Sequence, residues 1–492
     1  MSQTLAEALD YACERHGDAI ALSDAGAELS YRQLSARAQA IVAMLLGAGL
    51  AAGEPVHVQV SNQPLDIVVL LAIWRAGGVA VPVHRATPAS VVAGFQQRTA
   101  ARFCIDLQSG CSDAQALSVI AAAAPPPRAL LTGAALIVFT SGSTGVPKGV
   151  VMGHDAFGGK IAQIHSLLRF GAGERTLLVL NITFSFGLWV SLLTLLRGGT
   201  LVMQPKFEPA VFLQTLVDQR ITRVGMVPTM MRVLFSHPGH EAAIDSITAA
   251  GHLKQILIGG ELLGPSLAET IRRRFASTEL IDIYGLTETA TCDFFSFPAD
   301  YTCFPGCIGR PSPQVQFRIS GADGQPVPSG ETGELQIRSP YLMRGYLDAP
   351  ELTAAAYQDG WFRTGDLARV VEGDVVALMG RQKEVISRGG NKVTPVEIEQ
   401  AICQHVDVAA AMAVGIADAL LGERIHLLLV PRAGAILDLA TLRRHLETQL
   451  ERYKHPDAWY LAEALPLGRT GKADRLQFKA AIVAGEIAPM PG

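Results

Sequence analysis

Residues 140–149 read TSGSTGVPKG and directly follow the apolar run AALIVF at 134–139. The apolar run predicts a buried strand that leads into the glycine-rich segment. Glycines let the backbone turn back and bring its N–H groups close to an anion, while hydroxyls and a lysine ammonium add donors and positive charge. The combination predicts a loop that holds the phosphates of a nucleotide. A plain turn rich in Gly, Ser and Thr is the alternative.

This loop differs from the common phosphate loop. That motif needs Gly, four residues, Gly-Lys and then Ser or Thr before a helix, whereas Lys148 here follows Pro147 and precedes Gly149. The missing pattern argues against a plain nucleoside triphosphate hydrolase.

The composition indicates a globular chain. It has 492 residues, 49% hydrophobic and 17% charged, with a formal net charge of -4. This length suits more than one domain, and the absence of a long run of one sign argues against nucleic acid or an anionic membrane surface as partners. Seven scattered cysteines indicate a reducing compartment. Cys303 and Cys307 lie close together, but no second pair completes a zinc site.

Neither a signal peptide nor a membrane span is expected. The N-terminus lacks a basic segment followed by an apolar core. The most apolar stretch, at 184–196, is shorter than the ~20 residues of a spanning helix. We therefore expect a cytoplasmic protein without membrane insertion.

Apolar patterns before the loop alternate between helical and strand periods. Helical spacing occurs at 5–15 and 33–46, a largely buried helix is expected at 65–74, and strands are expected at 56–60 and 79–83. This alternation implies parallel sheet covered by helices. The segment AAAAPPPR at 121–128 is expected to be a surface loop, because the strand at 134–139 must join a sheet already begun.

Two later strands end in glycine-rich turns. Residues 255–261 read QILIGGE, and residues 280–289 read LIDIYGLTET. Open parallel sheets bind ligands beyond the carboxyl ends of their strands, so these turns are candidates for the nucleotide site.

The phosphate loop resembles the signature loop of the adenylate-forming superfamily, which contains acyl-CoA synthetases, adenylation domains of peptide synthetases and beetle luciferases. Its members join ATP to a carboxylic acid and release pyrophosphate. Similar motifs run through the whole chain in the family's order: GGE at 259–261, YGLTE at 284–288, TGD at 364–366, GRQK at 380–383 and LPLGRTGK at 465–472. The last departs from the usual form, which has Pro and Ser or Thr in place of Gly468 and Arg469.

The resemblance implies an α/β fold with two domains. Residues 1–382 would form a large N-terminal domain of parallel-type sheets with flanking helices and a small β-structure, which binds ATP and the acid. Residues 383–492 would form a small mobile α/β domain with its hinge at Lys383. Within the second part we expect a helix at 439–451 that is capped by Asp438.

The resemblance also implies the nucleotide-binding residues. Those expected to hold ATP or AMP are Thr140, Ser141, Gly142, Ser143, Thr144, Lys148, Gly259, Gly260, Glu261, Asp282, Tyr284, Gly285, Asp366 and Arg381. The loop hydroxyls and Lys148 would hold the β- and γ-phosphates, and the Gly-Gly-Glu turn would pack against adenine. Tyr284 would stack on adenine, and Asp366, with Arg381 as its neighbour, would accept from the ribose hydroxyls.

Three residues are implied to be catalytic. A carboxylate is a poor acyl donor because its leaving group would be oxide, whereas an acyl-adenylate has a good leaving group. Forming it brings two anions together, which requires positive charge. Lys472 would bridge the substrate carboxylate and the α-phosphate, Thr287 would support the α-phosphate, and Glu288 would hold Mg²⁺.

The second step is transfer to a thiol. The resemblance implies that the C-terminal domain rotates about Lys383, so that Arg388, Gly389 and Gly390 come to line a pantetheine tunnel. The expected acceptor is coenzyme A, because no carrier domain follows in the sequence. A separate carrier protein is the alternative acceptor. A catalytically inactive nucleotide-binding protein is a third reading, against which Lys148, Glu288, Asp366 and Lys472 all argue.

The acid-binding residues are the least specified part of the site. The expected pocket comprises Phe184, Ser185, Trp189, Met226, Thr229, Met230 and Ala290. Ser185 stands where we expect the aspartate of amino-acid-activating members, and the histidine of many fatty and aryl acid ligases is also missing. Contact of Arg232 with a second carboxylate is the alternative, but its helical spacing favours a solvated face. We therefore expect an apolar aromatic or short-to-medium aliphatic monocarboxylic acid.

Overall fold

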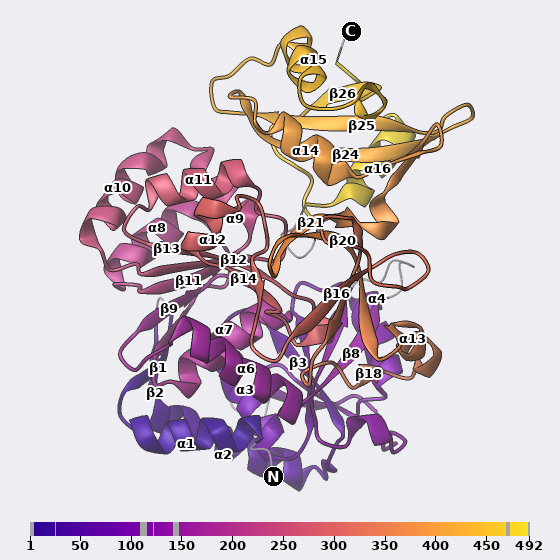
Figure 1. Cartoon of the computed structure of the whole chain (residues 1–492). Coiled ribbons are helices and arrows are strands. Elements are labelled where there is room, and N and C mark those ends of the chain that lie inside the picture. Colours follow the sequence, from indigo (N-terminus) through magenta and orange to yellow (C-terminus); the bar gives the residue numbers. More distant parts are fainter. Residues whose placement is uncertain are drawn as a thin grey trace.

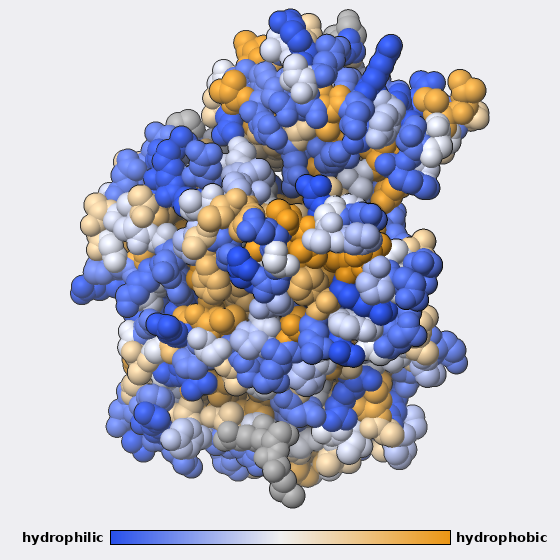
Figure 2. Space-filling view, viewed as in Figure 1, coloured by the Kyte–Doolittle hydropathy of each residue, from blue (hydrophilic) through white to orange (hydrophobic). Residues whose placement is uncertain are grey.

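The structure is a computed structural model that describes residues 4–24, 26–108, 116–121, 123–140, 147–468 and 473–490. Three β-sheets with surrounding helices form a large N-terminal domain, and a fourth sheet forms the core of a small C-terminal domain at the top of Figure 1. In the space-filling view a narrow junction joins the two parts (Figure 2). The predicted α/β architecture of one large and one small domain is therefore confirmed.

The largest sheet has nine strands in the order β15-β14-β13-β12-β11-β9-β10-β1-β2. Its strands are β1 (Ile20–Ser23), β2 (Glu28–Ser30), β9 (Arg175–Leu178), β10 (Thr200–Met203), β11 (Arg223–Met226), β12 (Gln255–Gly259), β13 (Glu279–Tyr284), β14 (Phe294–Ser296) and β15 (Arg310–Pro311). The central strands are parallel, and the strands at both ends of the sheet are antiparallel. The sheet is thus mixed, and the two predicted glycine-rich turns follow adjacent strands, β12 and β13.

The second sheet carries the phosphate loop. Its seven strands run β18-β8-β7-β4-β3-β5-β6. They are β3 (Pro55–Val60), β4 (Val79–His84), β5 (Phe103–Ile105), β6 (Leu117–Val119), β7 (Ala134–Thr140), β8 (Lys148–Gly153) and β18 (Gly345–Tyr346). Strand β7 joins a sheet already begun, as predicted, by pairing with β4, and the unpredicted β8 returns antiparallel to β7 with Thr140 opposite Lys148. The two ends of the loop therefore lie side by side.

The remaining two sheets lie before and after the point in the sequence where the N-terminal domain ends and the C-terminal domain begins. The third sheet is antiparallel and contains β16 (Gln316–Ser320), β17 (Gly333–Arg338), β19 (Tyr357–Gln358), β20 (Trp361–Glu372) and β21 (Val375–Arg381). The C-terminal sheet contains β22 (Ile386–Arg388), β23 (Asn391–Val393), β24 (Val408–Asp418), β25 (Gly422–Pro431) and β26 (Ala458–Leu461). The C-terminal core begins at Ile386. A domain boundary at Lys383 stays a prediction.

The helices begin at residues that suit a first turn. They are α1 (Leu5–His16), α2 (Tyr31–Gly47), α3 (Pro64–Arg75), α4 (Ala89–Thr99), α6 (His154–Leu168), α7 (Ser185–Leu196), α8 (Pro209–Asp218), α9 (Pro228–Phe235), α10 (Glu241–Ala250), α11 (Pro265–Arg274), α12 (Pro298–Cys303), α13 (Pro350–Ala355), α14 (Pro395–Ile402), α15 (Leu439–Glu447) and α16 (Arg475–Ala484). Short 3₁₀ helices are η1 (Ala129–Leu131), η2 (Pro238–His240), η3 (Thr287–Thr289), η4 (Gln382–Glu384) and η5 (Arg452–Lys454). Proline is tolerated at the first helical position, because its missing N–H would have no partner there. Asp438 accepts from the Thr441 N–H at 2.9 Å, which confirms the predicted cap.

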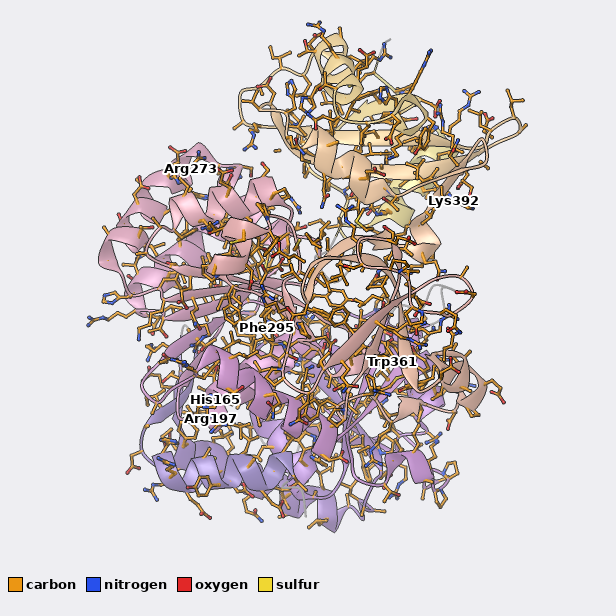
Figure 3. All side chains as sticks on the ribbon, viewed as in Figure 1. His165, Arg197, Arg273, Phe295, Trp361 and Lys392 are labelled. Carbon is orange, nitrogen blue, oxygen red and sulfur yellow. The ribbon has the colours of Figure 1, made fainter. Side chains whose placement is uncertain are left out.

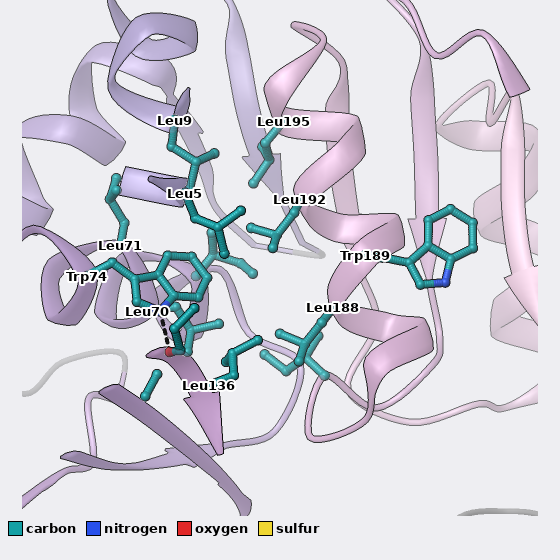
Figure 4. Close-up of a cluster of buried hydrophobic side chains, with 14 of the residues drawn as sticks. Leu5, Leu9, Leu70, Leu71, Trp74, Leu136, Leu188, Trp189, Leu192 and Leu195 are labelled. Atoms are coloured by element: carbon teal, nitrogen blue, oxygen red, sulfur yellow. Dashed lines mark hydrogen bonds between the residues drawn. The ribbon is translucent and has the colours of Figure 1, made fainter. Parts of the chain in front are cut away.

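Helix α7 is buried on two faces, because it packs against β9, β10 and β11 of the nine-stranded sheet and against helices α1 and α6. Figure 4 shows Leu188, Leu192 and Leu195 packed with leucines of α1 and α3, while Trp189 points away from that cluster. Burial among two layers explains why 184–196 is the most apolar stretch of the sequence. Across the described residues, no helix is both long enough and apolar enough to cross a membrane.

Candidate active site

A cavity of ≈ 360 Å³ lies where the β7–β8 hairpin, η3 and the end of β21 meet. Its walls include five residues that the sequence singled out: Thr140, Lys148, Glu288, Arg381 and Lys383. It also includes residues that the sequence analysis did not assign to the site, among them Glu334, Tyr346 and Arg363. The cavity thus gathers two lysines, two carboxylates and two arginines from segments more than two hundred residues apart.

Tyr346 links Lys148, at the end of the predicted phosphate loop, to Glu288 of the turn Thr287–Thr289, which is called the catalytic turn for its predicted role. Its ring lies 5.0 Å from Lys148 Nζ, and its hydroxyl donates to Glu288 Oε1 at 3.1 Å. Burial and the neighbouring Glu288 carboxylate raise the pKa of Tyr346, so the hydroxyl stays protonated as a donor. The sequence did not assign Tyr346 to the site, because the strand that positions it, β18, pairs with the unpredicted β8.

Tyr284, Asp366 and Arg381 form a second group beside the cavity. Tyr284 Oη donates to Asp366 Oδ2 at 2.6 Å, and Arg381 Nε lies 2.9 Å from Asp366 Oδ1. Asp366 and Arg381 face each other across β20 and β21. Burial raises the pKa of the Asp366 carboxyl, and the Arg381 charge opposes that shift. The structure therefore brings together the residues expected at adenine and ribose.

The backbone around Gly259 and Gly285, one in each turn, leaves no room for a side chain. A Cβ at Gly259 would lie 2.4 Å from the Ile283 carbonyl oxygen, and one at Gly285 would lie 2.2 Å from the Cys292 nitrogen. Gly260 has φ +84°, which favours glycine. Close approach of backbone to backbone thus fixes the shape of the two turns at the sheet edge.

The turn Thr287–Thr289 is followed by a segment with a strained backbone. Ala290, Thr291 and Cys292 have successive φ values of 56°, 68° and 55°, a left-handed conformation that costs about 1 to 3 kcal/mol for each non-glycine residue. The next residue, Asp293, is completely buried and pairs with the buried Lys160 at 2.9 Å. The Asp293 carboxylate also accepts from the Thr289 hydroxyl. This buried pair anchors both sides of the strained segment.

The residues expected to line the acid pocket differ in how far their side chains are buried. Ser185 Oγ lies 3.4 Å from Thr287 Oγ1, so it reaches the catalytic turn. Trp189 is fully buried and stacks on Phe186 with ring centroids 5.5 Å apart. Met226 and Ala290 are also buried, whereas Phe184 and Met230 are half-buried. Their contact with an acid stays a prediction.

Asp282 is engaged inside the domain. It is 6% exposed and accepts from Tyr301 Oη at 2.8 Å. Burial raises the pKa of this carboxyl to about 7. The predicted contact of Asp282 with the nucleotide is untested.

Glu261 is the meeting point of several groups. It accepts from the Thr229 hydroxyl at 2.8 and 3.0 Å and lies 3.5 Å from Arg232 Nη1. It also accepts from the backbone N–H of Ala473 at 2.9 Å. Arg232 is therefore ion-paired, with 26% of its side chain exposed, on a face that was expected to be solvated.

Several predicted residues lie outside the described part of the chain or away from the cavity. Ser141, Gly142, Ser143, Thr144 and Lys472 are outside the described residues. Arg388 pairs with Asp457 at 2.5 Å in the C-terminal domain, and Gly389 and Gly390 follow it with positive φ. Lys392, on the adjoining strand, appears at the right of that domain in Figure 3. None of the three tunnel candidates lines the cavity.

Comparison with known proteins shows the family of this chain. The family model of the AMP-binding enzyme matches residues 9–347, and that of the AMP-binding enzyme C-terminal domain matches residues 397–472. Feruloyl-CoA synthase from an Amycolatopsis species is 30% identical over 468 residues, which cover 92% of this chain and 94% of the relative. Sulfoacetate–CoA ligase from Cupriavidus necator is 31% identical over 488 residues, which cover 92% of each protein.

A solved structure extends the agreement to the fold. ATP-bound MatB from Rhodopseudomonas palustris has a TM-score of 0.84 at 26% identity, covering 97% of this chain and 99% of that protein. Fold and site together define an adenylate-forming acid ligase. The chain belongs to the AMP-binding enzyme family, among the AMP-forming acid–CoA ligases.

Proposed function

We propose that this enzyme joins ATP to an apolar monocarboxylic acid, releases pyrophosphate and transfers the acyl group to the thiol of coenzyme A. The observation that carries the proposal is the meeting of Lys148, Glu288 and Arg381 at one cavity, with Arg381 held by Asp366. A polyanion needs cations near its phosphates and acceptors near its sugar, and this cavity offers both. Coenzyme A as the acceptor is supported by the two ligases named above.

Each group has a distinct task in the proposed reaction. Lys148 and the phosphate loop bind the outer phosphates, and Asp366 accepts from the ribose hydroxyls. The Gly259–Gly260 turn and Tyr284 border adenine. Thr287 supports the α-phosphate while Lys472 neutralises the approaching carboxylate. Positive charge aimed at the forming bond lowers the barrier to joining two anions.

Mg²⁺ is the metal that this site would hold. Among the described residues, no three His, Cys, Asp or Glu side chains gather into a metal cage. Mg²⁺ is commonly held by one or two carboxylates together with substrate phosphates, so the single carboxylate of Glu288 fits that role. When bound, the ion screens the phosphate charge.

The residues expected to line the acid pocket favour a substrate that carries no charge beyond its reacting carboxylate. The pocket set of seven residues contains no charged side chain, and burying an unpaired ammonium or carboxylate there would be costly. The nearest cation on α9, Arg232, is already paired with Glu261. The two named relatives act on very different acids, one aromatic and one a small sulfonate, so the proposed acid class rests on the residues of this chain.

The test is a screen of acids by pyrophosphate release in the presence of ATP. Two pairs of acids test the effect of a second charged group on the substrate. Phenylalanine is compared with 3-phenylpropanoate, and malonate with propionate. Benzoate and C4–C10 straight-chain acids complete the set. Faster turnover of phenylalanine or malonate than of their uncharged-body partners would contradict the proposed acid class.

A second arm identifies the acceptor. The best acid is incubated with ATP and with coenzyme A, a phosphopantetheinyl carrier protein, or neither. We expect thioester formation with coenzyme A at micromolar to millimolar concentrations. Acylation of the carrier alone would instead assign the enzyme to carrier loading.

A further inference from the structure

The two domains meet at the carboxylate of Glu261. This residue follows the Gly259–Gly260 turn of the N-terminal domain, and only 11% of its side chain is exposed. Its Oε1 accepts from the backbone N–H of Ala473, which belongs to the C-terminal domain. Thr229 donates to both of its oxygens, which fixes the carboxylate in one orientation.

Ala473 is the residue directly after Lys472 in the sequence. It pairs with Leu467 in an antiparallel bridge, and the next N–H, that of Asp474, donates to the Pro466 carbonyl at 2.8 Å. The two ends of the segment 467–473 are therefore held together. The contact at Ala473 thus constrains where the residue directly after Lys472 in the sequence meets the N-terminal domain.

The surroundings make this contact important for domain docking. A cavity of ≈ 410 Å³ lies nearby between the domains, lined by residues of α9 and α11 on one side and of α14 and β24 on the other. A second interdomain hydrogen bond, from Arg432 to Ser266 Oγ, is long at 3.4 Å. Much of the interface is thus not closely packed, and a short bond to a charged acceptor counts for more there.

We propose that Glu261 is a positioning residue: its carboxylate docks the segment that carries Lys472 in the arrangement that forms the adenylate. The proposal rests on the proposed function for the role of Lys472. It also explains why an acidic side chain is present beside a nucleotide site, where a carboxylate would otherwise repel phosphate. The charge of Glu261 is balanced by Arg232 and directed at a backbone N–H.

The first test measures docking without any substrate. Hydrogen exchange at single-residue resolution is followed at Ala473 and Asp474 in the wild type, Glu261→Ala and Glu261→Gln. We expect exchange at Ala473 to rise at least tenfold in Glu261→Ala. The rise should be smaller in Glu261→Gln, which keeps an oxygen acceptor. Asp474 should change little, because its acceptor is Pro466 within the same domain.

The second test separates the two half-reactions with the best acid from the screen. Glu261→Ala should lower the rate of adenylate formation at least tenfold at saturating ATP, with the KM for ATP changed less than threefold. Thioester formation from the supplied acyl-adenylate should stay within twofold of the wild type. Glu261→Gln should recover part of the lost rate. Ser266→Ala, which removes the other interdomain hydrogen bond, should leave both rates within twofold.

The outcomes are distinct. Unchanged exchange at Ala473 in Glu261→Ala would overturn the docking role, whatever the enzyme's substrate proves to be. A rise in the KM for ATP at an unchanged saturated rate would assign the Glu261 side chain to nucleotide binding instead. Wild-type chain that activates no acid but shows the expected exchange would refute the proposed function and leave the docking contact standing.

Discussion

At the level of single residues, Asp282 couples stability to pH. Its pKa of about 7 in the folded protein lies above the ordinary value of 3.8 because the carboxyl is buried. The folded state therefore retains a proton that the unfolded chain has lost. The stabilising contribution is complete below pH 3.8 and is lost as pH rises to about 7, at about 1.4 kcal/mol for each unit of difference.

We expect Asp282→Asn to remove much of this dependence, since asparagine stays neutral and keeps an oxygen for the Tyr301 hydroxyl. At pH 8 the variant should melt roughly 3 °C or more above the wild type. At pH 5 the offset should be less than half of that at pH 8, because the unfolded wild-type chain is already ionised there but most of the difference between the two pKa values lies above pH 5. Calorimetry at both pH values is the measurement, and an equal offset at both would exclude titration of Asp282 as its cause.

Asp366 is expected to bind the ribose, and Tyr284 to orient it. Asp366→Ala should raise the KM for ATP about tenfold or more, because the acceptor of the ribose hydroxyls is lost and Arg381 is left unpaired. Tyr284→Phe removes only the 2.6 Å hydrogen bond and should have a smaller effect. Steady-state kinetics over a range of ATP concentrations compares the two. An unchanged KM in Asp366→Ala would contradict the assignment.

Lys472 is expected to act in only one half-reaction. Its charge is needed while the carboxylate and the α-phosphate combine, so Lys472→Ala should lower adenylate formation by about a hundredfold or more. Thioester formation from supplied acyl-adenylate should persist. Single-turnover assays of each half-reaction measure the two rates, and an equal loss in both would refute this role.

Residues carried by sequence motifs were easier to predict than residues placed by tertiary pairing. Asp366 and Arg381 lie in short motifs, and both reach the site through the pairing of β20 with β21. Tyr346 contacts Lys148 and Glu288 only because its strand pairs with β8, which lies far away in the sequence. The partner of Arg232 could not be predicted either, since helical spacing does not show that Glu261 follows the neighbouring strand.

At the level of elements, the buried pair of Lys160 and Asp293 supports the catalytic turn. Helix α6 supplies Lys160, and the strained segment 290–292 leads into Asp293. Removing one charge leaves the other buried without compensation. We therefore expect Lys160→Met to lower the free energy of unfolding by about 3 to 5 kcal/mol. Denaturant titration of the N-terminal domain's fluorescence measures this loss.

The matched control is the double variant Lys160→Met/Asp293→Leu, which leaves no charge. It should recover part of the lost stability, because an apolar pair can replace a buried ion pair at little cost. It should not recover adenylate formation, since the Asp293 bond to Thr289 is also lost. A double variant as unstable as Lys160→Met would mean that packing, rather than charge, causes the effect.

Elements whose apolar residues form a clear pattern in the sequence were predicted, and elements whose pattern is interrupted were not. Helix α2 follows its apolar spacing closely, α3 is almost continuously apolar, and valines recur along strands β3 and β4. Strand β8 was missed because glycines at 149 and 153 and the preceding loop obscure its pattern. Helix α15 ends at Glu447, four residues before the prediction, because residues beyond it turn toward η5.

At the level of the whole molecule, Lys383 is the expected hinge. It is exposed in η4, between Arg381, which binds Asp366, and the C-terminal sheet. Proline fixes φ, so Lys383→Pro should hold one domain arrangement. We expect adenylate formation within about threefold of the wild type and transfer to coenzyme A reduced at least tenfold. The two half-reaction assays measure this, with Lys383→Ala as the control that keeps a free φ. Equal rates for both variants would place the hinge elsewhere.

The pairing of β18 with β8 has a consequence for biosynthesis. Residues 345–346 close the edge of a sheet whose other strands end at residue 153. At roughly 5 to 20 residues per second, a ribosome needs about 10 to 40 s to make the intervening chain. During that time the edge beside the phosphate loop lacks its partner, and an open edge can pair with strands of other nascent chains. The nascent protein therefore has an unpaired sheet edge until β18 is made. The same late strand supplies Tyr346 and covers that edge.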